Sequence, residues 1–262
     1  MPVLINRTVL KIKAREIIRT SNPSAIKVGM LFIVISLIFS LLSSYVLGAI
    51  FTESDLTQIT KHIEAGNVEF AYAYMADCMA ENMPTPSAQL ISLVMQVVMI
   101  IVSVGFTIFI LNTIRSTAPC YGNLLDGFAM PVKIIVLYFL IGLFVILWSM
   151  LLFIPGVIAA YRYRLAIYLL IDHPEYGPLQ CIRESKRLMR GRKWELFTLD
   201  LSFLGWAILG RIPFLGWIVA LWNTPYFATT YALYYQELAG IGTDSSRFDH
   251  QDYNYYNGPD WQ

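Results

Sequence analysis

The sequence predicts an all-α membrane protein, a polytopic bundle of six transmembrane helices with amphipathic helices on its cytoplasmic surface. Of the 262 residues, 56% are hydrophobic and only 14% are charged, whereas soluble domains carry about 25% charged residues. The apolar residues gather in blocks long enough to cross a hydrocarbon core about 30 Å thick. A soluble fold of this composition would expose large apolar patches and aggregate.

The first two spans are predicted at residues 28–51 and 88–111. The first contains no charged residue, and the second is interrupted only by Gln89 and Gln96. Each is long enough to cross the bilayer, because a membrane helix needs about 20 apolar residues. The connection between them, residues 52–87, is therefore expected on one side of the membrane.

The third apolar block, residues 134–171, predicts a helical hairpin. As one straight helix it would be about 57 Å long, almost twice the hydrocarbon thickness. Pro155 and Gly156 mark the expected break, since proline removes a helix hydrogen bond and glycine permits a tight turn. The two spans are then residues 134–153 and 156–171.

The last apolar block, residues 196–235, predicts a second hairpin for the same reason of length. Gly210 and Pro213 interrupt it, which gives spans at 196–210 and 212–235. Residues 1–238 then form a single membrane domain.

Basic residues set the expected orientation, because Lys and Arg accumulate in cytoplasmic loops. Residues 1–27 and 172–193 are both rich in Lys and Arg, whereas residues 52–87 contain Lys61 alone beside several acidic residues. Both termini are therefore predicted to be cytoplasmic in a multi-pass protein of a bacterial plasma membrane. The first span is too long for the apolar region of a cleavable signal peptide, and the polar tail, residues 239–262, is expected to be disordered.

Two basic segments precede membrane spans and show helical periodicity. Leu10, Ala14, Ile17 and Ile18 form one apolar stripe. A second stripe consists of Pro178, Cys181, Ile182, Ser185, Leu188 and Met189. Basic amphipathic helices beside a span are typical of surfaces that bind anionic headgroups. The candidate anionic-lipid surface consists of Arg15, Arg19, Arg183, Lys186, Arg187 and Arg190. The alternative is that each is a cytosolic helix packed on the protein's own loops.

The order of elements suggests three copies of one unit, a surface helix followed by a hairpin. Residues 7–111, 120–171 and 177–236 would be the copies. The shared letters are few, so chance similarity stays open as the alternative.

Four charged residues fall inside or beside predicted spans and form a candidate intramembrane polar cluster: Arg162, Arg164, Glu195 and Asp200. Intramembrane charges are costly and are functional candidates for that reason. Because the two arginines lie two residues apart on a helix, Asp200 can meet only one of them directly. The cluster is either a structural ion pair between hairpins or part of a polar pathway.

The sequence contains no motif that indicates catalysis or a cofactor. Motifs for hydrolases, metalloproteases and phosphate-binding loops are missing. The cysteines and histidines have no metal-ligand spacing, and Cys78 is expected on the opposite side of the membrane from Cys120 and Cys181. We therefore expect no enzyme, metal, cofactor or disulfide, and the net charge of +1 argues against nucleic-acid binding.

Two runs of sequence resemble a known bacterial family. They are IPGVIAAYRYRLAIYLLIDHPEYGPLQCIRESKRLMRGRKWELFTLDLSFLGW, residues 154–206, and TPYFATTYALYYQEL, residues 224–238. Both are similar to the family named "domain of unknown function 975", and residues 124–153 are similar to its preceding part. The resemblance implies a polytopic membrane protein without assigned activity, with a more distant similarity to the membrane domain of some glycerophosphodiester phosphodiesterases. Arg164 departs from the pattern, in which a small residue is expected.

These observations favour a non-enzymatic envelope protein with an accessory or regulatory role. Its expected partners are anionic lipids of the cytoplasmic leaflet, and a second copy of the chain or another envelope protein. The alternative is a transporter or exporter of a small amphiphile, lipid or peptide, which would include protection against a membrane-active toxin.

Overall fold

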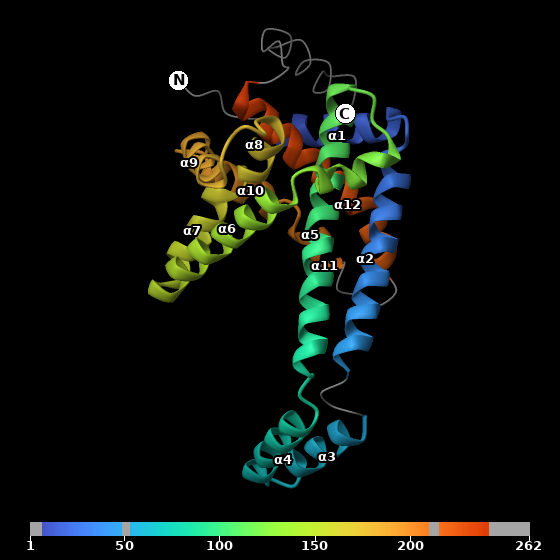
Figure 1. The fold of residues 1–262 in the computed structure, drawn as a ribbon, viewed down its shortest axis with the longest axis vertical. Helices are drawn as coiled ribbons and strands as arrows, with labels where there is room; N and C mark the ends of the chain where they lie inside the picture. The colour runs from blue at the N-terminus through green and yellow to red at the C-terminus, as the bar shows by residue number, and fades with distance from the viewer. Residues whose placement is uncertain (1–6, 49–52, 210–214, 241–262) are drawn as a thin grey trace, which may run out of the picture. The chain divides into compact units, whose positions relative to one another are not determined.

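The fold is that of a computed structural model, which describes residues 7–48, 53–209 and 215–240. The described residues are helical throughout, with short connections and no strand among them. The chain divides into two compact units, Met1–Ile33 with Ile101–Gln262, and Val34–Ile100. Each unit is described by itself below (Figure 1).

Four stretches of helix among the described residues are long and apolar enough to cross a membrane. They are α2 (Ala25–Leu47), α5 (Pro86–Arg115), α6 (Pro131–Leu151) and the stretch Phe153–Asp172. The last consists of α7 (Phe153–Tyr163) and α8 (Ala166–Asp172). The described part of the chain is thus all-helical, with four stretches that resemble membrane spans. These stretches overlap the first four predicted spans.

The turn between α6 and α7 does not lie where the sequence suggested. The backbone becomes extended at Leu152, with φ −161° and ψ 144°, whereas Pro155 and Gly156 both lie inside the first turns of α7. Proline is tolerated there, because the first N–H groups of a helix have no partner within it. A Cβ on Gly156 would lie 1.9 Å from Ser149 Oγ, so this glycine allows α6 and α7 to approach closely.

The predicted fifth span is not one continuous helix. It consists of α10 (Lys193–Leu201) and α11 (Leu204–Leu209), which a turn at Ser202 and Phe203 separates. The predicted break at Gly210 and Pro213 lies outside the described residues. The chain then continues as α12 (Leu215–Ala239), which contains Pro225.

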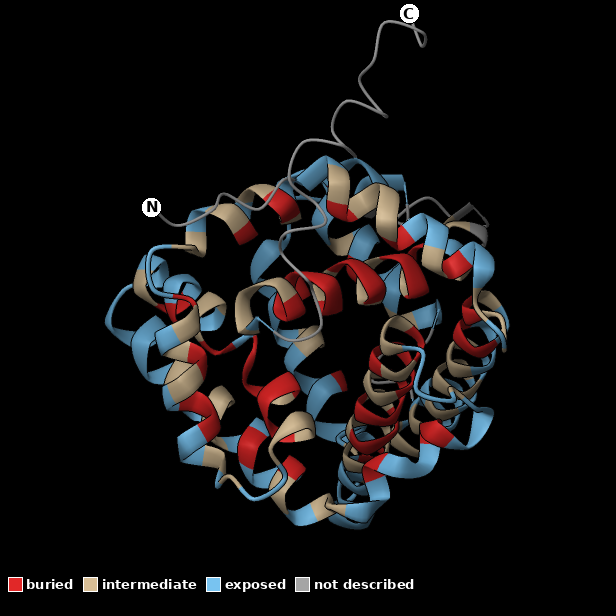
Figure 2. Cartoon of the chain, turned by 90° about the horizontal axis from the view of Figure 1, so that it is seen from above, coloured by how far each residue is buried: buried red, intermediate tan, exposed pale blue. Residues whose placement is uncertain are grey.

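The second half of α12 supplies much of the core of the unit Met1–Ile33 with Ile101–Gln262. Tyr226, Tyr234 and Tyr235 are among its largest fully buried side chains, and buried positions are red in Figure 2. Gly29 of α2 is so close to Pro225 of α12 that a Cβ would lie 3.1 Å from the proline ring. A small residue at position 29 therefore lets the two helices touch.

Both predicted surface helices pack their apolar stripes on the protein's own helices. In α1 (Arg7–Thr20) the buried residues are Leu10, Ala14 and Ile18, and α1 packs on α12. In α9 (Pro178–Leu188) the buried residues include Cys181 and Ile182, and α9 packs on α6 and α8. The apolar stripes are therefore covered by protein, and by helices rather than by the loops that the alternative expected.

A short 3₁₀-helix, η1 (Tyr121–Ala129), lies directly on α5. A Cβ on Gly105 of α5 would be 2.0 Å from the Leu124 carbonyl oxygen, and one on Gly127 would be 2.3 Å from the Ile101 carbonyl oxygen. Two glycines thus allow backbone to contact backbone. This 3₁₀-helix lies at the start of the second proposed repeat, residues 120–171.

In the unit Val34–Ile100, α3 (Glu53–Glu64) and α4 (Val68–Glu81) form a helical hairpin between α2 and α5 in the sequence. Ile59, Ala71 and Cys78 are buried where the two helices meet. Gly66, with φ +75°, makes the turn between them, a backbone conformation that favours glycine. This hairpin is the part of the connection 52–87 that the sequence predicts on the outer side.

Candidate functional site

Polar side chains meet at two places among the apolar helices of the unit Met1–Ile33 with Ile101–Gln262. We call them the Asp172 cluster (Arg115, Asp172 and Tyr235) and the Asp200 cluster (Tyr161, Arg164, Asp200 and Tyr231). Each joins α12 to helices that are distant in the sequence. Both consist of one carboxylate with an arginine and tyrosine hydroxyls.

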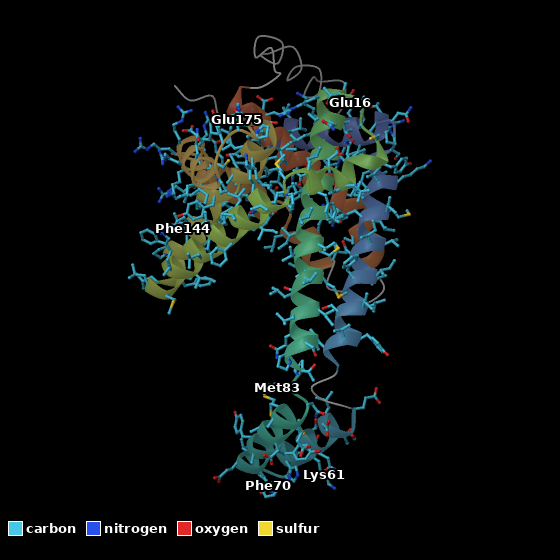
Figure 3. The ribbon with its side chains drawn as sticks, in the orientation of Figure 1. Glu16, Lys61, Phe70, Met83, Phe144 and Glu175 are labelled. Atoms are coloured by element: carbon cyan, nitrogen blue, oxygen red, sulfur yellow. The ribbon has the colours of Figure 1, made fainter. Side chains whose placement is uncertain are left out.

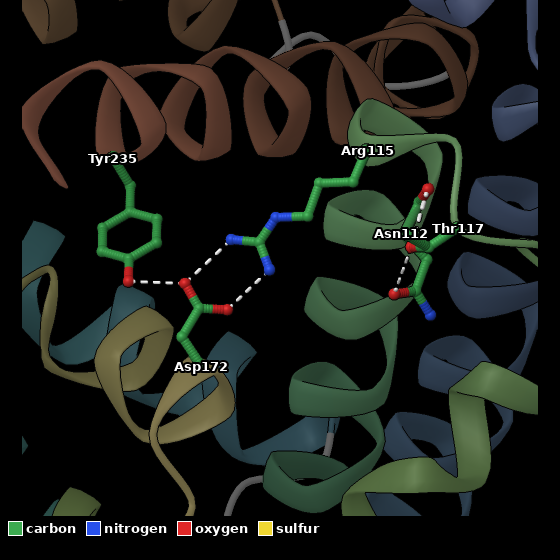
Figure 4. A network of polar contacts seen from close by, with 5 residues as sticks. All are labelled: Asn112, Arg115, Thr117, Asp172 and Tyr235. Atoms are coloured by element: carbon green, nitrogen blue, oxygen red, sulfur yellow. Dashed lines mark hydrogen bonds and ion pairs between the residues drawn. The ribbon is translucent and has the colours of Figure 1, made fainter. Parts of the chain in front are cut away.

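The Asp172 cluster is a bidentate ion pair supported by a tyrosine (Figure 4). Arg115 Nη1 and Nη2 donate to the two carboxylate oxygens of Asp172 at 2.7 and 2.8 Å. Tyr235 Oη donates to Asp172 Oδ2 at 2.7 Å. The Asp172 side chain is only 7% exposed and that of Arg115 25%, so solvent screens this pair weakly.

The cluster connects three helices through residues at or near their ends. Arg115 ends α5, Asp172 ends α8 and Tyr235 lies in the last turns of α12. Nearby, Lys133 Nζ donates to the carbonyl oxygen of Pro174. The connections 112–133 and 172–193 therefore lie together, as expected if both are on one side of a membrane.

The Asp200 cluster is more open to solvent. Tyr161 Oη and Arg164 Nη1 donate to Asp200 Oδ2 at 2.8 and 3.0 Å, and Tyr231 Oη donates to Oδ1. The Arg164 guanidinium also lies over the Tyr231 ring, 4.3 Å from its centre. The side chains of Arg164 and Asp200 are 39% and 23% exposed. Solvent therefore reaches this ion pair.

The structure brings two of the four residues of the predicted polar cluster together, Arg164 and Asp200. Arg162 is bound to α9 through its backbone. Its carbonyl oxygen accepts a hydrogen bond from Ser185 Oγ of α9 at 2.8 Å. Glu195 lies 3.5 Å from Arg192, an ion pair within the first turn of α10. Tyr161 and Tyr231, which sequence reasoning did not select, complete the site around Asp200.

Sequence reasoning also missed the Asp172 cluster. Arg115 and Asp172 lie just outside the predicted spans 88–111 and 156–171, in the polar connections that follow them. The available signal was that each is a single charge at the end of an apolar block, where opposite charges on neighbouring helices can pair.

The basic face of α9 is exposed. Arg183 and Arg187 of α9, and Arg190 in the turn just after it, are exposed to solvent, with Arg187 paired to Glu184 at 2.7 Å. We call these three the arginines of α9. Lys186 differs, since its ammonium lies 5.3 Å from the centre of the Tyr163 ring and 5.9 Å from that of Phe144. Lys186 therefore contacts the protein's own aromatic rings, unlike the three arginines.

The basic residues of α1 divide in a similar way. Arg15 and Arg19 are exposed, and Arg15 lies 5.5 Å from the centre of the Tyr226 ring. Arg7 and Lys11 instead donate to carbonyl oxygens of Thr198 and Ser202, at 3.4 and 3.3 Å. The carbonyl groups at the C-terminal end of a helix attract cations because of the helix dipole. Arg7 and Lys11 of α1 thus bind the C-terminal end of α10.

Lys11 shows the effect of this packing on ionisation. Burial lowers the pKa of its ammonium, and the nearby charges of Arg15 and Arg7 lower it further. The carbonyl of Ser202 and the Phe203 ring, 4.4 Å away, are the partners that hold this ammonium.

A groove lies between α2 and α5 inside the unit Val34–Ile100. It has a volume of about 630 Å³, within the range of small-molecule sites. Four serines of α2 line one wall, opposite Met95, Gln96 and Met99 of α5: Ser36, Ser40, Ser43 and Ser44. Hydroxyl groups in an otherwise apolar wall are suited to an amphiphile.

Metal-binding chemistry has little support among these groups. In the part of the chain that the structure describes, no three His, Cys, Asp or Glu side chains gather closely enough to hold a metal ion. The carboxylates of both clusters are each bound by arginine and tyrosine donors instead.

Comparison with known proteins gives one family. No curated protein and no solved structure matches the chain significantly, and the distant similarity to the phosphodiesterase membrane domain stays a prediction. The sequence pattern of the family described as "Protein of unknown function (DUF975)" matches residues 5–241, which is nearly the whole length. The resemblance noted in the sequence is confirmed, and the chain belongs to the DUF975 family.

Proposed function

We propose that this protein binds anionic phospholipid headgroups at the cytoplasmic face of a bacterial plasma membrane and acts there as a non-enzymatic accessory protein. The observation that carries the proposal is the exposed arginine face of α9 and the turn that follows it, formed by Arg183, Arg187 and Arg190. Each basic residue near an anionic surface contributes about 1 kcal/mol to association. Three such residues on one short helix and its following turn would favour anionic over zwitterionic lipid.

The packing of α9 supports this role. Its buried residues fix the helix on α6 and α8, and Ser185 bonds to the backbone of α7. The guanidinium groups are thus presented by a rigid element, so little conformational entropy is lost when a headgroup binds. Arginine is suited to this task because it binds phosphate oxygens bidentately.

The proposal includes the topology on which it depends. Six spans with both termini in the cytoplasm would place α1, η1 and α9 on the same side, beside the anionic leaflet. The contact of connections 112–133 and 172–193 through Lys133 and Pro174 supports a shared side. The basic bias of residues 1–27 and 172–193 supports the cytoplasm as that side.

Native mass spectrometry of the purified protein with phosphatidylglycerol and phosphatidylethanolamine tests the proposal. The triple variant Arg183→Gln, Arg187→Gln, Arg190→Gln should lose its preference for the anionic lipid, while folding and membrane insertion persist. The matched triple Arg→Lys variant keeps the charge and should retain much of the preference. An unchanged preference in the glutamine variant would contradict the proposal.

Lys186→Gln serves as a control within the same helix. Because Lys186 contacts the Tyr163 and Phe144 rings, its loss should leave the lipid preference nearly unchanged. A loss of preference equal to that of the triple variant would mean that net charge, rather than the exposed arginines, decides binding.

A second candidate function is transport of a small amphiphile, and the groove lined by Ser36, Ser40 and Ser44 favours it. Transport requires water to reach polar groups inside the protein, at this groove or, in the other unit, at the Asp200 cluster. A cysteine placed at position 40 or 200 should then react with a membrane-impermeant thiol reagent. If neither position reacts in folded protein, the transport proposal fails.

A further inference from the structure

The α3–α4 hairpin exposes an apolar face that nothing in its own unit covers. We call Leu56 and Ile63 of α3 with Val68, Tyr72 and Met79 of α4 the hairpin face. All five are exposed, and the Tyr72 side chain, the largest, is 68% exposed. Exposed large apolar side chains that are contiguous mark binding surfaces, whereas isolated ones do not.

The spacing of these residues makes the face continuous. At about 100° per residue, Leu56 and Ile63 share one side of α3, and Val68, Tyr72 and Met79 share one side of α4. The buried side is marked by Ile59 in α3 and by Ala71 in α4. On both helices, the exposed stripe is reached from this buried side by turning about the helix axis in the same direction. In an antiparallel pair, equal rotations from the contact bring both stripes to the same face of the hairpin.

Acidic residues flank this face along its outer edges. Glu53 and Glu64 of α3 and Glu69 of α4 are exposed and lie about 70–90° around their helices from the apolar stripes, whereas Asp77 and Glu81 are exposed on the opposite side of α4. Lys61 is the only Lys or Arg in residues 53–87. Asp55 is used inside the hairpin, where Tyr74 Oη donates to its Oδ1 at 2.9 Å. This hydrogen bond is the main reason that the pKa of Tyr74 rises to about 12.

The internal contacts hold the hairpin in one conformation. The His62 ring lies 5.2 Å from that of Phe70 and 6.5 Å from that of Tyr74, and Figure 3 shows Lys61 and Phe70 at the same end of the hairpin. The acidic residues are therefore displayed on a fixed support.

We propose that the hairpin face docks a cationic amphipathic peptide, whose apolar side covers Tyr72 and Met79 and whose basic residues meet the flanking carboxylates. The negative charge beside the hairpin face favours a cationic partner over a second copy of the hairpin and over a membrane surface. A second copy of the hairpin would place acidic residues against acidic residues across a two-fold interface, and an anionic membrane surface would repel them. A helix with apolar residues on one side and Lys or Arg on the other complements both properties.

The test uses the full-length protein in neutral phosphatidylcholine nanodiscs and two synthetic helical peptides. The peptides share one leucine face, and their polar faces carry either lysine or glutamate. Fluorescence anisotropy should show binding of the lysine peptide that weakens as salt rises, and no measurable binding of the glutamate peptide. Equal binding of both peptides would overturn the proposal.

Two groups of variants test the apolar residues and the acidic residues of this surface separately. Tyr72→Ser with Met79→Ser should weaken binding of the lysine peptide about tenfold. Glu53→Gln, Glu64→Gln and Glu69→Gln should each weaken it about 1.5- to 5-fold. Glu175→Gln, an exposed acid of the other unit, is the matched control and should change nothing.

Two outcomes would replace the peptide by another occupant and so overturn the proposal. The first is a change from dimer to monomer in Tyr72→Ser with Met79→Ser, which would assign the face to a second copy. The second is equal affinity in wild type and both groups of variants, which would place peptide binding elsewhere. Circular dichroism of each variant confirms that the hairpin stays folded.

Discussion

Arg115 and Asp172, which are 57 residues apart in the sequence, form a bidentate ion pair at the ends of α5 and α8. The carboxylate also accepts a hydrogen bond from Tyr235 of α12. One side chain thus links three helices that form the core of their unit. The pair is mostly buried, so its partners cannot be exchanged for water without a cost in stability.

Asp172→Asn should destabilise the protein strongly. The amide cannot neutralise Arg115 and accepts fewer hydrogen bonds, which leaves a partly buried guanidinium without its counter-charge. We expect a loss of roughly 2–3 kcal/mol, measured as a lower unfolding temperature in detergent by fluorescence-detected size exclusion. Tyr235→Phe removes one hydrogen bond and should cost about 1 kcal/mol.

Glu175→Gln is the control for this measurement, because Glu175 is exposed and only three residues from Asp172. It should unfold at the wild-type temperature. If Asp172→Asn also did so, the cluster would not hold the three helices together.

Asp200→Asn should have a smaller effect than Asp172→Asn. Arg164 is 39% exposed and can be solvated when the charge of its partner is lost. One of Tyr161 and Tyr231, which bind different oxygens of Asp200, can still donate to the amide oxygen, and the hydroxyl of the other can accept a hydrogen bond from the amide NH2. The expected loss is about 1 kcal/mol or less. The same unfolding assay tests the order of the two variants, and the reverse order would contradict the greater exposure of the Asp200 cluster.

Gly105→Ala should disturb the contact between α5 and η1. The new methyl group would lie 2.0 Å from a backbone oxygen, that of Leu124, and backbone cannot move aside as a flexible side chain can. We expect destabilisation by about 1–3 kcal/mol. Gly142→Ala in α6 is the matched control, since no heavy atom lies within 4 Å of its added Cβ. A Gly105→Ala protein as stable as the control would refute the close contact.

Thiol labelling should distinguish the three cysteines. Cys120 is exposed, whereas Cys78 and Cys181 are buried. Burial also raises the pKa of the Cys181 thiol, so its reactive thiolate is scarcer at every pH below that pKa. Folded protein should therefore take up one maleimide, on Cys120, and denatured protein three. Rapid labelling of Cys181 in folded protein would contradict its burial.

The same chemistry tests the orientation. In intact cells an impermeant maleimide should fail to reach Cys120 until the membrane is permeabilised. A Glu64→Cys variant in a Cys120→Ser background should react at once, because residue 64 lies in the hairpin predicted outside. The opposite pattern would invert the topology.

The sequence predicted the class of fold well, because long apolar blocks that lack charge are typical of helices that cross a bilayer. It located the helix pair at 134–171 but placed the turn at Pro155 and Gly156 instead of Leu152. Proline fits the first turn of a helix as well as a break does, and only the contact with Ser149 shows why position 156 is glycine.

The candidate site was less predictable because it depends on which helices are neighbours. Charge and depth in the sequence indicated that Asp200 can pair with one arginine, and the structure pairs it with Arg164. Periodicity predicted which side of α1 and α9 is apolar. It could not show that α12, α6 and α8 would cover those sides, since amphipathicity is the same for a helix on lipid and a helix on protein.

Binding of anionic lipid by α9 is best measured from the phospholipid that stays with the protein when it is extracted from native membranes in polymer-bounded discs. For wild type, the ratio of anionic to zwitterionic phospholipid should exceed that of the bulk membrane. For the triple variant Arg183→Gln, Arg187→Gln, Arg190→Gln it should fall to the bulk value. Equal ratios in the two proteins would contradict the claim that the exposed arginines of α9 bind anionic lipid.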